Sequence, residues 1–588
     1  MKRDMGIIAA AIVLLAAFSL CAATFDPAQA WADLLHYIRI ARYDLAKAYG
    51  QSLIDGNVDP VALFEWSARS PQDYQLLQRA SQNMYDKELA QIADRLIALI
   101  EQGRQARRSD PQVISQEIER LLGPSERGNA IALQRLRDSG EYAVPFILDA
   151  MAEPTRRTYI DRLVQALANI GGAAVRPLCV AIRAADPAVR VEVVRALGRI
   201  GSSEVLPFLK YVAENDRVDE IRAVAAAGIR QVDPSASAQS AASLFYRLAM
   251  QYYQQPGSSG TVNMWFWDPN SQSLVRRPVD GRQFNDLMSM RCCEWTLRAD
   301  ASYADAVSLW AAAFMRAQSY GIPLPGYLPY ADAGPLVHAT ATGPRYLQQV
   351  LALALKDGNK ALAIDALEGL MANAGPRSIL LPVGSVQPVV EALRWQDPQV
   401  RTMAAIAIAN AGPRGPFNAA QIVVENLSAA IASVADPNAA PDPNKEGYAI
   451  RSLEAMLAIA SRAEGTYDLL PSQQALITAT QTGPASIRAL ACHVLAHIPT
   501  AQAQQALASQ GLRAENDLDL RVTALEALAL SAKNGGCLLE GQMVEGLLSL
   551  VRSNQTQPDL RLAAASALGS LDLPSTTVKD LILAGSVD

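Results

Sequence analysis

Two stretches of this sequence repeat each other without a gap, and this repeat limits the possible folds more than any other feature. The stretches are DPAVRVEVVRALGRIG (Asp186–Gly201) and DPQVRTMAAIAIANAG (Asp397–Gly412). They share the opening Asp-Pro, a Val-Arg pair, an internal Ala and the final Gly. Weaker copies place an Arg after an aliphatic residue at Arg488, Arg521 and Arg561. An internal repeat predicts an array of one supersecondary unit stacked on itself.

The spacing within the repeat predicts a helix with defined ends. Asp186 suits the N-cap, where its carboxylate accepts the free N–H groups of the first turn. Pro187 suits the first helical position, which needs no N–H donor. Gly201 can end the helix in a left-handed conformation. The segment Gly171–Gly201 is long enough for two short antiparallel helices, and because one pair cannot bury its own apolar stripe, the pairs must stack.

These units resemble HEAT repeats, in the short form shared with the phycobilisome-lyase HEAT-like family. The resemblance rests on the Asp-Pro-x-Val-Arg start and the Ala-Leu/Ile-x-x-x-Gly end, and it covers residues 126–235 and 346–588. It implies an all-α fold, an armadillo-like α-solenoid in which Asp and Arg side chains bond along the stack. A bilin lyase activity does not follow from it, because the repeat is generic and the N-terminus, described below, predicts export.

The remaining segments are helical but fit no HEAT frame. Residues 31–125 predict a helical cap over the open end of the solenoid. Residues 236–345 predict a separate module with a larger core, because the stretch 245–330 holds 15 of the 35 aromatic residues. Its helix Ala241–Tyr253 precedes a pair that resembles a junction between tetratricopeptide repeats. That resemblance rests on Leu297, Asp300, Tyr303, Ala306 and Trp310.

An aromatic β-hairpin (Val262–Val279) interrupts this helical module. Asp268-Pro269-Asn270-Ser271 is turn chemistry, and Pro278 makes the second strand an edge. Alternation places Met264 and Phe266 on one face and Trp265 and Trp267 on the other. The first face suits packing, and the second, with Arg276 and Arg277 nearby, has the residue types of binding hot spots. The candidate partner-binding residues are therefore Trp265, Trp267, Arg276 and Arg277, although packing of both Trp on the helices of the module is favoured for the two Trp.

The N-terminus predicts export. Lys2 and Arg3 precede an apolar run, Ile7–Leu20, and small residues follow, which is the pattern of a secretory signal peptide within residues 1–30. Cleavage after Ala23 or Ala30 would release the protein into the periplasm or cell envelope. An uncleaved signal anchor in the inner membrane is the alternative. The five later Cys are not a disulfide framework; a Cys292–Cys293 bridge is possible, and burial of both in a helix is favoured.

No pattern in the sequence indicates catalysis. The four His include His493 and His497 on one helix face beside Cys492, and a solvated pair is favoured over a zinc site. With a net charge of −6 and no strong basic patch, nucleic acid is not expected as a partner. We therefore expect a non-enzymatic scaffold that binds another protein, with no cofactor and no metal. The alternative is a ligand-binding protein or enzyme that uses the aromatic segment 240–335.

Overall fold

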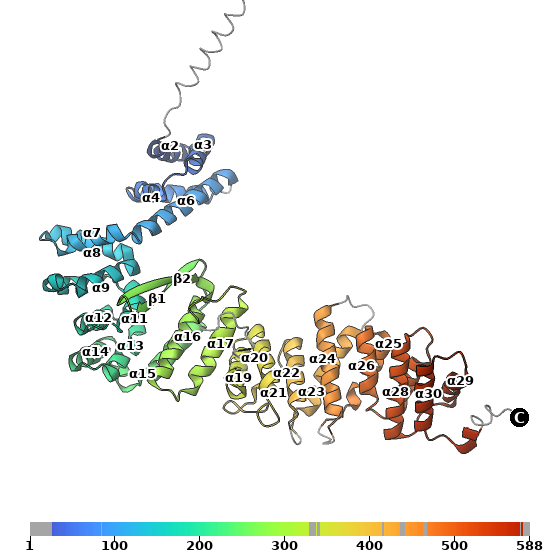
Figure 1. Ribbon diagram of the computed structural model, residues 1–588. Helices are drawn as coiled ribbons and strands as arrows, with labels where there is room; N and C mark the ends of the chain where they lie inside the picture. The colour runs from blue at the N-terminus through green and yellow to red at the C-terminus, as the bar shows by residue number, and fades with distance from the viewer. Residues whose placement is uncertain are drawn as a thin grey trace, which may run out of the picture. The chain divides into compact units, whose positions relative to one another are not determined.

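The computed structural model describes residues 26–83, 85–328, 337, 341–413, 417–435, 442–462, 467–576 and 578–579. Within these residues the protein is helical apart from one two-stranded hairpin (Figure 1). The prediction of an all-α fold of paired helices is therefore confirmed. The signal segment of residues 1–25 lies outside the described residues.

The chain forms two compact units. Unit 1 consists of the described residues up to Ala241 together with Asn263–Arg277, and unit 2 consists of Ala242–Val262 and the described residues from Pro278 onward. The segment 236–345, which the sequence presents as one module, is thus divided, and the greater part of the hairpin belongs to unit 1. Among the described residues, no helix combines the length and hydropathy needed to cross a bilayer.

Unit 1 begins with helices that enclose their own apolar core and continues with successive helix pairs. Four of its helices begin with Pro immediately after an Asp N-cap, so their first turns are fixed by the sequence itself. The helices are α2 (Pro27–Arg39), α3 (Tyr43–Asp55), α4 (Pro60–Ala68), α5 (Pro71–Ser81), α6 (Lys87–Arg108), α7 (Pro111–Leu122), α8 (Glu126–Ser139), α9 (Val144–Ala152), α10 (Ile160–Ile170), α11 (Gly172–Ala181), α12 (Pro187–Ile200), α13 (Leu206–Asn215) and α14 (Asp219–Val232), with 3-10 turns η1 (Gly140–Ala143), η2 (Pro154–Tyr159), η3 (Ser203–Val205) and η4 (Pro234–Ala238).

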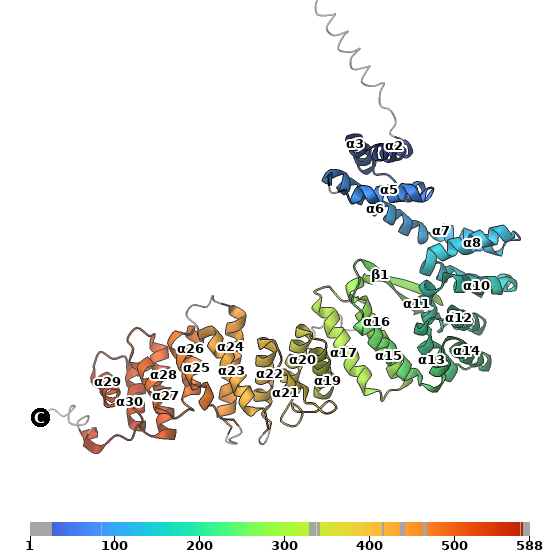
Figure 2. The same ribbon diagram turned by 180° about the vertical axis from the view of Figure 1, so that it is seen from behind.

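Unit 2 begins with the aromatic helices and continues with stacked pairs. The two opposite views show the pairs from α19 to α30 following one another along unit 2, with α30 next to α28 and α29 beyond it (Figures 1 and 2). They are α15 (Ala241–Gln254), α16 (Gly281–Ala299), α17 (Ala304–Ser319), α19 (Pro344–Lys356), α20 (Lys360–Asn373), α21 (Pro388–Ala392), α22 (Pro398–Ala411), α23 (Ala420–Ala435), α24 (Pro443–Ala460), α25 (Gln473–Thr482), α26 (Ala485–Leu495), α27 (Ala501–Leu512), α28 (Leu518–Gly535), α29 (Gly541–Arg552) and α30 (Pro558–Ser570), with the 3-10 turn η5 (Leu470–Ser472).

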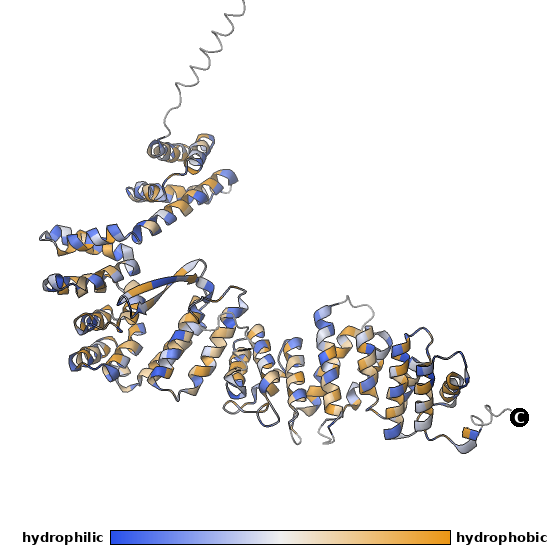
Figure 3. Ribbon diagram, viewed as in Figure 1, coloured by the Kyte–Doolittle hydropathy of each residue, from blue (hydrophilic) through white to orange (hydrophobic). Residues whose placement is uncertain are grey.

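Both full copies of the repeat have the helix ends that their sequences predict. The Asp186 carboxylate accepts the Ala188 N–H at 2.8 Å, and the Asp397 carboxylate accepts the Gln399 N–H at 2.9 Å. Gly201 and Gly412 end the helices in the left-handed region, at φ values of 73° and 60°. Polar and apolar residues alternate around most helices (Figure 3), which leaves each pair with an apolar stripe to bury against its neighbours.

The repeated Arg has a structural role in each copy. In the two full copies and in the last copy, its guanidinium reaches back to the turn between the two helices of its own pair and binds carbonyl oxygens there, whereas Arg488 bonds Asn516 in the following pair at 3.4 Å. Arg190 donates to Ala184 O at 2.7 Å, Arg401 to Trp395 O at 2.9 Å, and Arg561 to Ser553 O at 2.6 Å. Arg190 also binds the Asp216 carboxylate in the next pair at 2.7 Å, which is the Asp–Arg bonding along the stack that the resemblance implies.

The aromatic residues at the start of unit 2 form ring contacts between α15, α16 and the turn before α17. Phe245 stacks on Trp295 with ring centroids 5.5 Å apart, and Tyr246 lies 5.1 Å from Tyr303. The predicted helix Ala241–Tyr253 is confirmed as α15, and α16 and α17 form the predicted pair. Cys292 and Cys293 are fully buried in α16 as free thiols, so the favoured placement in a helix is confirmed.

Candidate functional site

The hairpin consists of β1 (Thr261–Asp268) and β2 (Ser273–Asp280). Its turn is fixed by the Asp268 carboxylate, which accepts the Asn270 N–H at 2.9 Å and the Ser271 hydroxyl at 2.8 Å. Gln272 closes the turn at a φ of 51°. Since an isolated hairpin of two strands is marginal in water, its stability must come from packing against the helices.

Within unit 1, the hairpin packs on the short turn η1 between α8 and α9. The Glu141 carboxylate accepts hydrogen bonds from Asn263 Nδ2 and from Trp265 Nε1, both at 2.8 Å. The Tyr142 hydroxyl accepts a third from Asn263 at 3.0 Å, and the Arg276 guanidinium lies 4.7 Å from the centre of the Tyr142 ring. One carboxylate and one phenol therefore attach β1 and β2 to the repeats.

The hypothesis of an exposed Trp face is wrong. Trp265 is 3% exposed and Trp267 is 9% exposed, because the turn η1 and the pair α11–α12 supply a surface that covers them. The favoured interpretation, that both Trp pack against helices, is confirmed as far as their burial goes, and the contacts that the structure shows for them are with Glu141 and with residues of α9 and α12 in the preceding repeats. Arg276 and Arg277 remain exposed at the surface. The four candidate residues thus come together, but the two Trp lie on the inner side of the hairpin; whether the group binds a partner stays a prediction.

A cavity of about 260 Å³ remains between the turn end of the hairpin and helices α9 and α12. Gln272 Oε1 accepts the Ala185 N–H at 3.1 Å and closes one side of it. Leu148, Val189 and Leu274 are apolar walls, and Asp149 contributes a carboxylate whose pKa is raised by burial. The lining residues are Pro145, Leu148, Asp149, Ala152, Ala184, Ala185, Asp186, Val189, Trp267, Gln272, Ser273 and Leu274.

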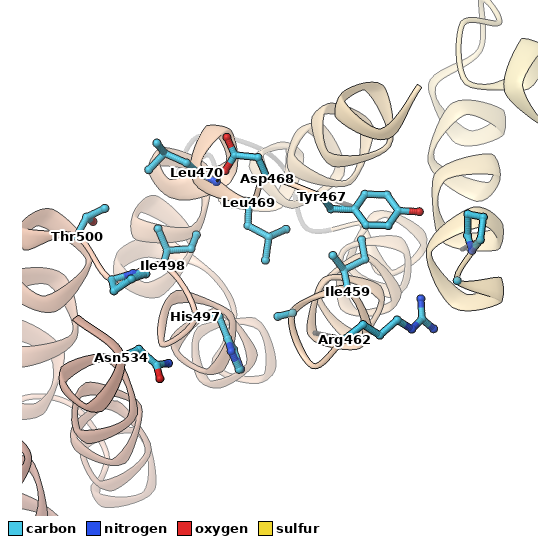
Figure 4. Close-up of a pocket in the computed structure, with 14 residues that line it drawn as sticks. Ile459, Arg462, Tyr467, Asp468, Leu469, Leu470, His497, Ile498, Thr500 and Asn534 are labelled. Atoms are coloured by element: carbon cyan, nitrogen blue, oxygen red, sulfur yellow. Dashed lines mark hydrogen bonds between the residues drawn. The ribbon is translucent and has the colours of Figure 1, made fainter. Parts of the chain in front are cut away.

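A second cavity, of about 610 Å³, lies in unit 2 where several helices end (Figure 4). Arg462 is on its wall, but its guanidinium already donates to Ala409 O at 2.6 Å and to Asn410 O at 3.0 Å. Burial raises the pKa of Tyr467 to about 12, and burial followed by the neighbouring His493 lowers the pKa of His497. A neutral phenol and a neutral imidazole can bind polar groups. The carboxylate in the lining is Asp468, which accepts the Leu470 N–H, and no ion pair with His497 occurs among the described residues, so His497 is not arranged as a general base.

A third cavity, of about 600 Å³ in unit 1, is lined by five Arg side chains. Arg107 pairs with Glu65 at 2.7 Å, Arg135 pairs with Glu117, and Arg108 donates to the Asp138 carbonyl at 2.8 Å. Arg104 also pairs with Glu101, so carboxylates offset three of the five positive charges and the cavity is a weak candidate for an anion site. Its Arg residues are Arg69, Arg104, Arg107, Arg108 and Arg135.

The prediction that the protein holds no metal depends mainly on His493 and His497, the two residues that could begin a zinc site. His493 is exposed and His497 is half-buried, while the adjacent Cys492 is fully buried and burial raises its pKa to about 12. Within the described ranges, no three His, Cys, Asp or Glu side chains gather closely enough to share a metal ion. These side chains therefore give no support for a zinc site on α26.

Sequence reasoning identified the hairpin but missed the residues that receive it. Glu141 and Tyr142 lie more than 120 positions before their hairpin partners, and Asp149 is one acidic residue on an ordinary helix. No periodicity or motif marks these residues. A contact between segments this far apart in the sequence follows only from the way the pairs stack.

Comparisons with known proteins agree with the repeat and add no activity. Residues 144–230, from α9 to α14, match the family model described as HEAT repeats, so the protein contains HEAT repeats in this part of unit 1. A comparison with curated protein sequences gave no match. Solved structures with some similarity include an engineered protein (14% identity, 79% of this chain and 99% of that chain, TM-score 0.30) and importin beta (12% identity, 97% and 71%, TM-score 0.31). Human deoxyhypusine hydroxylase in complex with glycerol is also similar (14% identity, 81% and 99%, TM-score 0.19), and TM-scores of this size say nothing about function.

Proposed function

We propose that this protein is a non-enzymatic scaffold of the bacterial cell envelope that binds another protein through its helical repeats. The observation that carries the proposal is the HEAT repeat match over residues 144–230, on helices that stack as pairs. Repeats of this type generally form extended surfaces for protein partners. The absence of catalytic motifs from the sequence supports binding over chemistry.

The hairpin gives unit 1 a surface that a plain helical array lacks. Hydrogen bonds from Asn263 and Trp265 to Glu141 hold it in place, and β2 presents Val275, Arg276 and Arg277 to solvent. An exposed apolar residue beside two Arg is a suitable rim for a protein interface. The buried Trp265 stabilises this arrangement, and Arg276 and Arg277 remain the candidates for direct contact with a partner.

The partner can be tested by site-specific photocrosslinking in the native envelope. A crosslinking amino acid replaces Val275 on the hairpin or Leu562 on α30, which are both exposed apolar residues. We expect one protein to be captured from at least one position, and the same pair to form a complex when both proteins are purified. A chain that captures no specific protein from either position, and forms no complex, would contradict the scaffold function.

Export is tested by the intact mass of the protein recovered from the envelope. Cleavage after Ala30 would remove the Asp26 cap and the first turn of α2, including Ala30, which is 5% exposed. Cleavage after Ala23 keeps this helix intact, so we expect the mature chain to begin at Thr24. Recovery of full-length protein in the membrane fraction would instead indicate an uncleaved anchor.

A further inference from the structure

The cavity beneath the turn of the hairpin has the size of one side chain. Its volume of about 260 Å³ exceeds the roughly 150 Å³ of a cavity that holds benzene, and it is below the range of about 300–1,000 Å³ typical of sites for whole small molecules. Leu148, Val189 and Leu274 contribute apolar side chains to its lining. An occupant therefore needs a slender apolar stem.

The charge that lines this cavity is acidic. Asp149 lies at the exposed edge of the cavity and has no hydrogen-bond or ion-pair partner among the described residues. Neighbouring atoms cover part of its carboxyl, and this partial burial raises its pKa with no basic group offsetting that rise. The other carboxylate, Asp186, already accepts the Ala188 N–H at 2.8 Å and lies 3.5 Å from Arg157. A positive group at Asp149 would thus supply a counter-charge that the chain itself does not provide.

Trp267, which also lines this cavity, has a buried hydrogen-bond donor, the indole Nε1, that lacks an acceptor among the described residues. An unpaired buried donor is unfavourable, so a backbone carbonyl that reached the indole after a small displacement of the ring would be favoured there. A peptide carries such a carbonyl next to each side chain.

We propose that this cavity receives a Lys or Arg side chain of the protein partner, with the alkyl stem between the apolar walls and the cationic end at Asp149. This inference rests on the proposed binding function and assigns it a specific site. The acidic lining disfavours phosphate and nucleic acid, and the volume disfavours a free cofactor. The site is formed by the hairpin and the HEAT repeats together, so neither element makes it alone.

The direct test uses short capped peptides on the full mature chain with 15N-labelled Trp. The Trp267 indole signal is identified by its loss in Trp267→Phe, and Trp265, bonded to Glu141, serves as the internal reference. Acetyl-Gly-Arg-Gly-amide and acetyl-Gly-Lys-Gly-amide should shift the Trp267 signal and leave that of Trp265 in place. The corresponding norleucine and Glu peptides should bind at least about tenfold more weakly, a difference of about 1.4 kcal/mol.

Three variants separate charge, space and unspecific effects. Asp149→Asn keeps the shape and removes the charge, and it should weaken the Arg peptide about tenfold. Ala152→Phe fills the exposed edge of the cavity and should abolish the shift. Glu220→Gln removes an exposed acid of unit 1 that does not line the cavity, and it should change nothing.

Several results would overturn the proposal. They are no Trp267 shift with either basic peptide, an equal shift with norleucine, or equal binding by Asp149→Asn. Failure of this site is distinguishable from failure of the scaffold function: if the wild type and both cavity variants capture the same partner equally, the site assignment fails while the function stands. If the wild type captures no partner, the function itself fails.

Discussion

The turn before α12 and the turn before α22 have the same sequence pattern but different neighbours. In unit 1, Arg190 bonds its own turn and also the Asp216 carboxylate of the next pair, and the hairpin residue Gln272 accepts the Ala185 N–H. In unit 2, Arg401 bonds only carbonyls of its own turn, at Trp395 and Gln396. The motif therefore fixes how each helix begins, and the residues around it decide what else the turn supports.

The two helices also differ in how they are buried. In α12, apolar positions such as Val193 and Leu197 are fully buried while Arg199 stays exposed, as in an ordinary amphipathic helix. In α22, every residue from Thr402 to Ala409 is buried, so the helix has no polar face over this span. The same frame thus forms a helix with one exposed side in unit 1 and a helix buried on all sides from Thr402 to Ala409 in unit 2.

The largest expected difference between the two turns comes from removing the Arg. Arg190→Ala leaves the Asp216 carboxylate buried without its partner, and we expect a loss of about 3–5 kcal/mol in the stability of unit 1. Arg401→Ala removes hydrogen bonds to neutral carbonyls and leaves no buried charge unpaired, so it should cost about 1–2 kcal/mol. Hydrogen–deuterium exchange of residues 187–200 and 398–411 measures both. Equal losses would mean that the Asp216 pair adds nothing to the motif.

Replacing the Gly that ends each helix should give the opposite order of stability losses from the Arg variants, with the larger loss in unit 2. A Cβ on Gly412 would collide with the guanidinium of Arg462, which binds the last carbonyls of α22, whereas a Cβ on Gly201 meets nothing within 4 Å. We expect Gly412→Ala to cost about 2–4 kcal/mol and Gly201→Ala about 1–2 kcal/mol. Urea unfolding of the two variants tests this. A larger loss at Gly201 would show that backbone strain outweighs the displaced Arg462.

The stability of the two units should depend on pH in opposite directions at Asp216 and Asp365, because their pKa values are shifted in opposite directions. At Asp216, burial opposes ionisation, but hydrogen bonds from Arg190 and the Val218 N–H outweigh it and lower the pKa; the stability it gives is present above about pH 4 and lost as the pH falls further. In α20 of unit 2, burial, with a contribution from Glu368, raises the pKa of Asp365 to about 6. Because this folded-state pKa lies above the unfolded value, stability should fall as the pH rises from about 4 to about 6.

Asp365→Asn removes the ionisable group and provides the test. At pH 7 we expect unit 2 to gain about 1 kcal/mol, a small value because the carboxyl is partly exposed and therefore screened by solvent. The slope of stability against pH between 4 and 6 should also become flatter. The matched variant Asp216→Asn should destabilise unit 1 at pH 7. If both variants shift stability in the same direction, the contrast between the two carboxylates does not hold.

The smallest effect is expected where the hairpin meets the turn before α12. Gln272→Ala removes the acceptor of the exposed Ala185 N–H, which water can replace, so the loss should be about 0.5 kcal/mol. Exchange at the Ala185 amide should nevertheless become faster, while exchange at Gln396, in the corresponding turn before α22, stays unchanged. Unchanged exchange at Ala185 would show that Gln272 does not protect that turn.

The sequence by itself determined the local structure of this protein. Asp-Pro starts, Gly ends and a helical stripe of apolar residues predict the paired helices around Asp186 and Asp397, and the aromatic run with its Asp268 turn predicts the hairpin. Each of these depends on residues within about one helix length of one another, so the pattern is visible in the chain.

Only the tertiary structure decided where the hairpin packs and what it encloses. Trp265 and Trp267 are residues that suit a binding face or a core equally well, and their burial depends on Glu141, Tyr142 and Val189. Asp149 became a candidate site residue only because stacking placed it beside Trp267. Pairing between distant segments is set by the shape of the whole stack and leaves no period in the sequence, which is why the repeats could be predicted and the cavity could not.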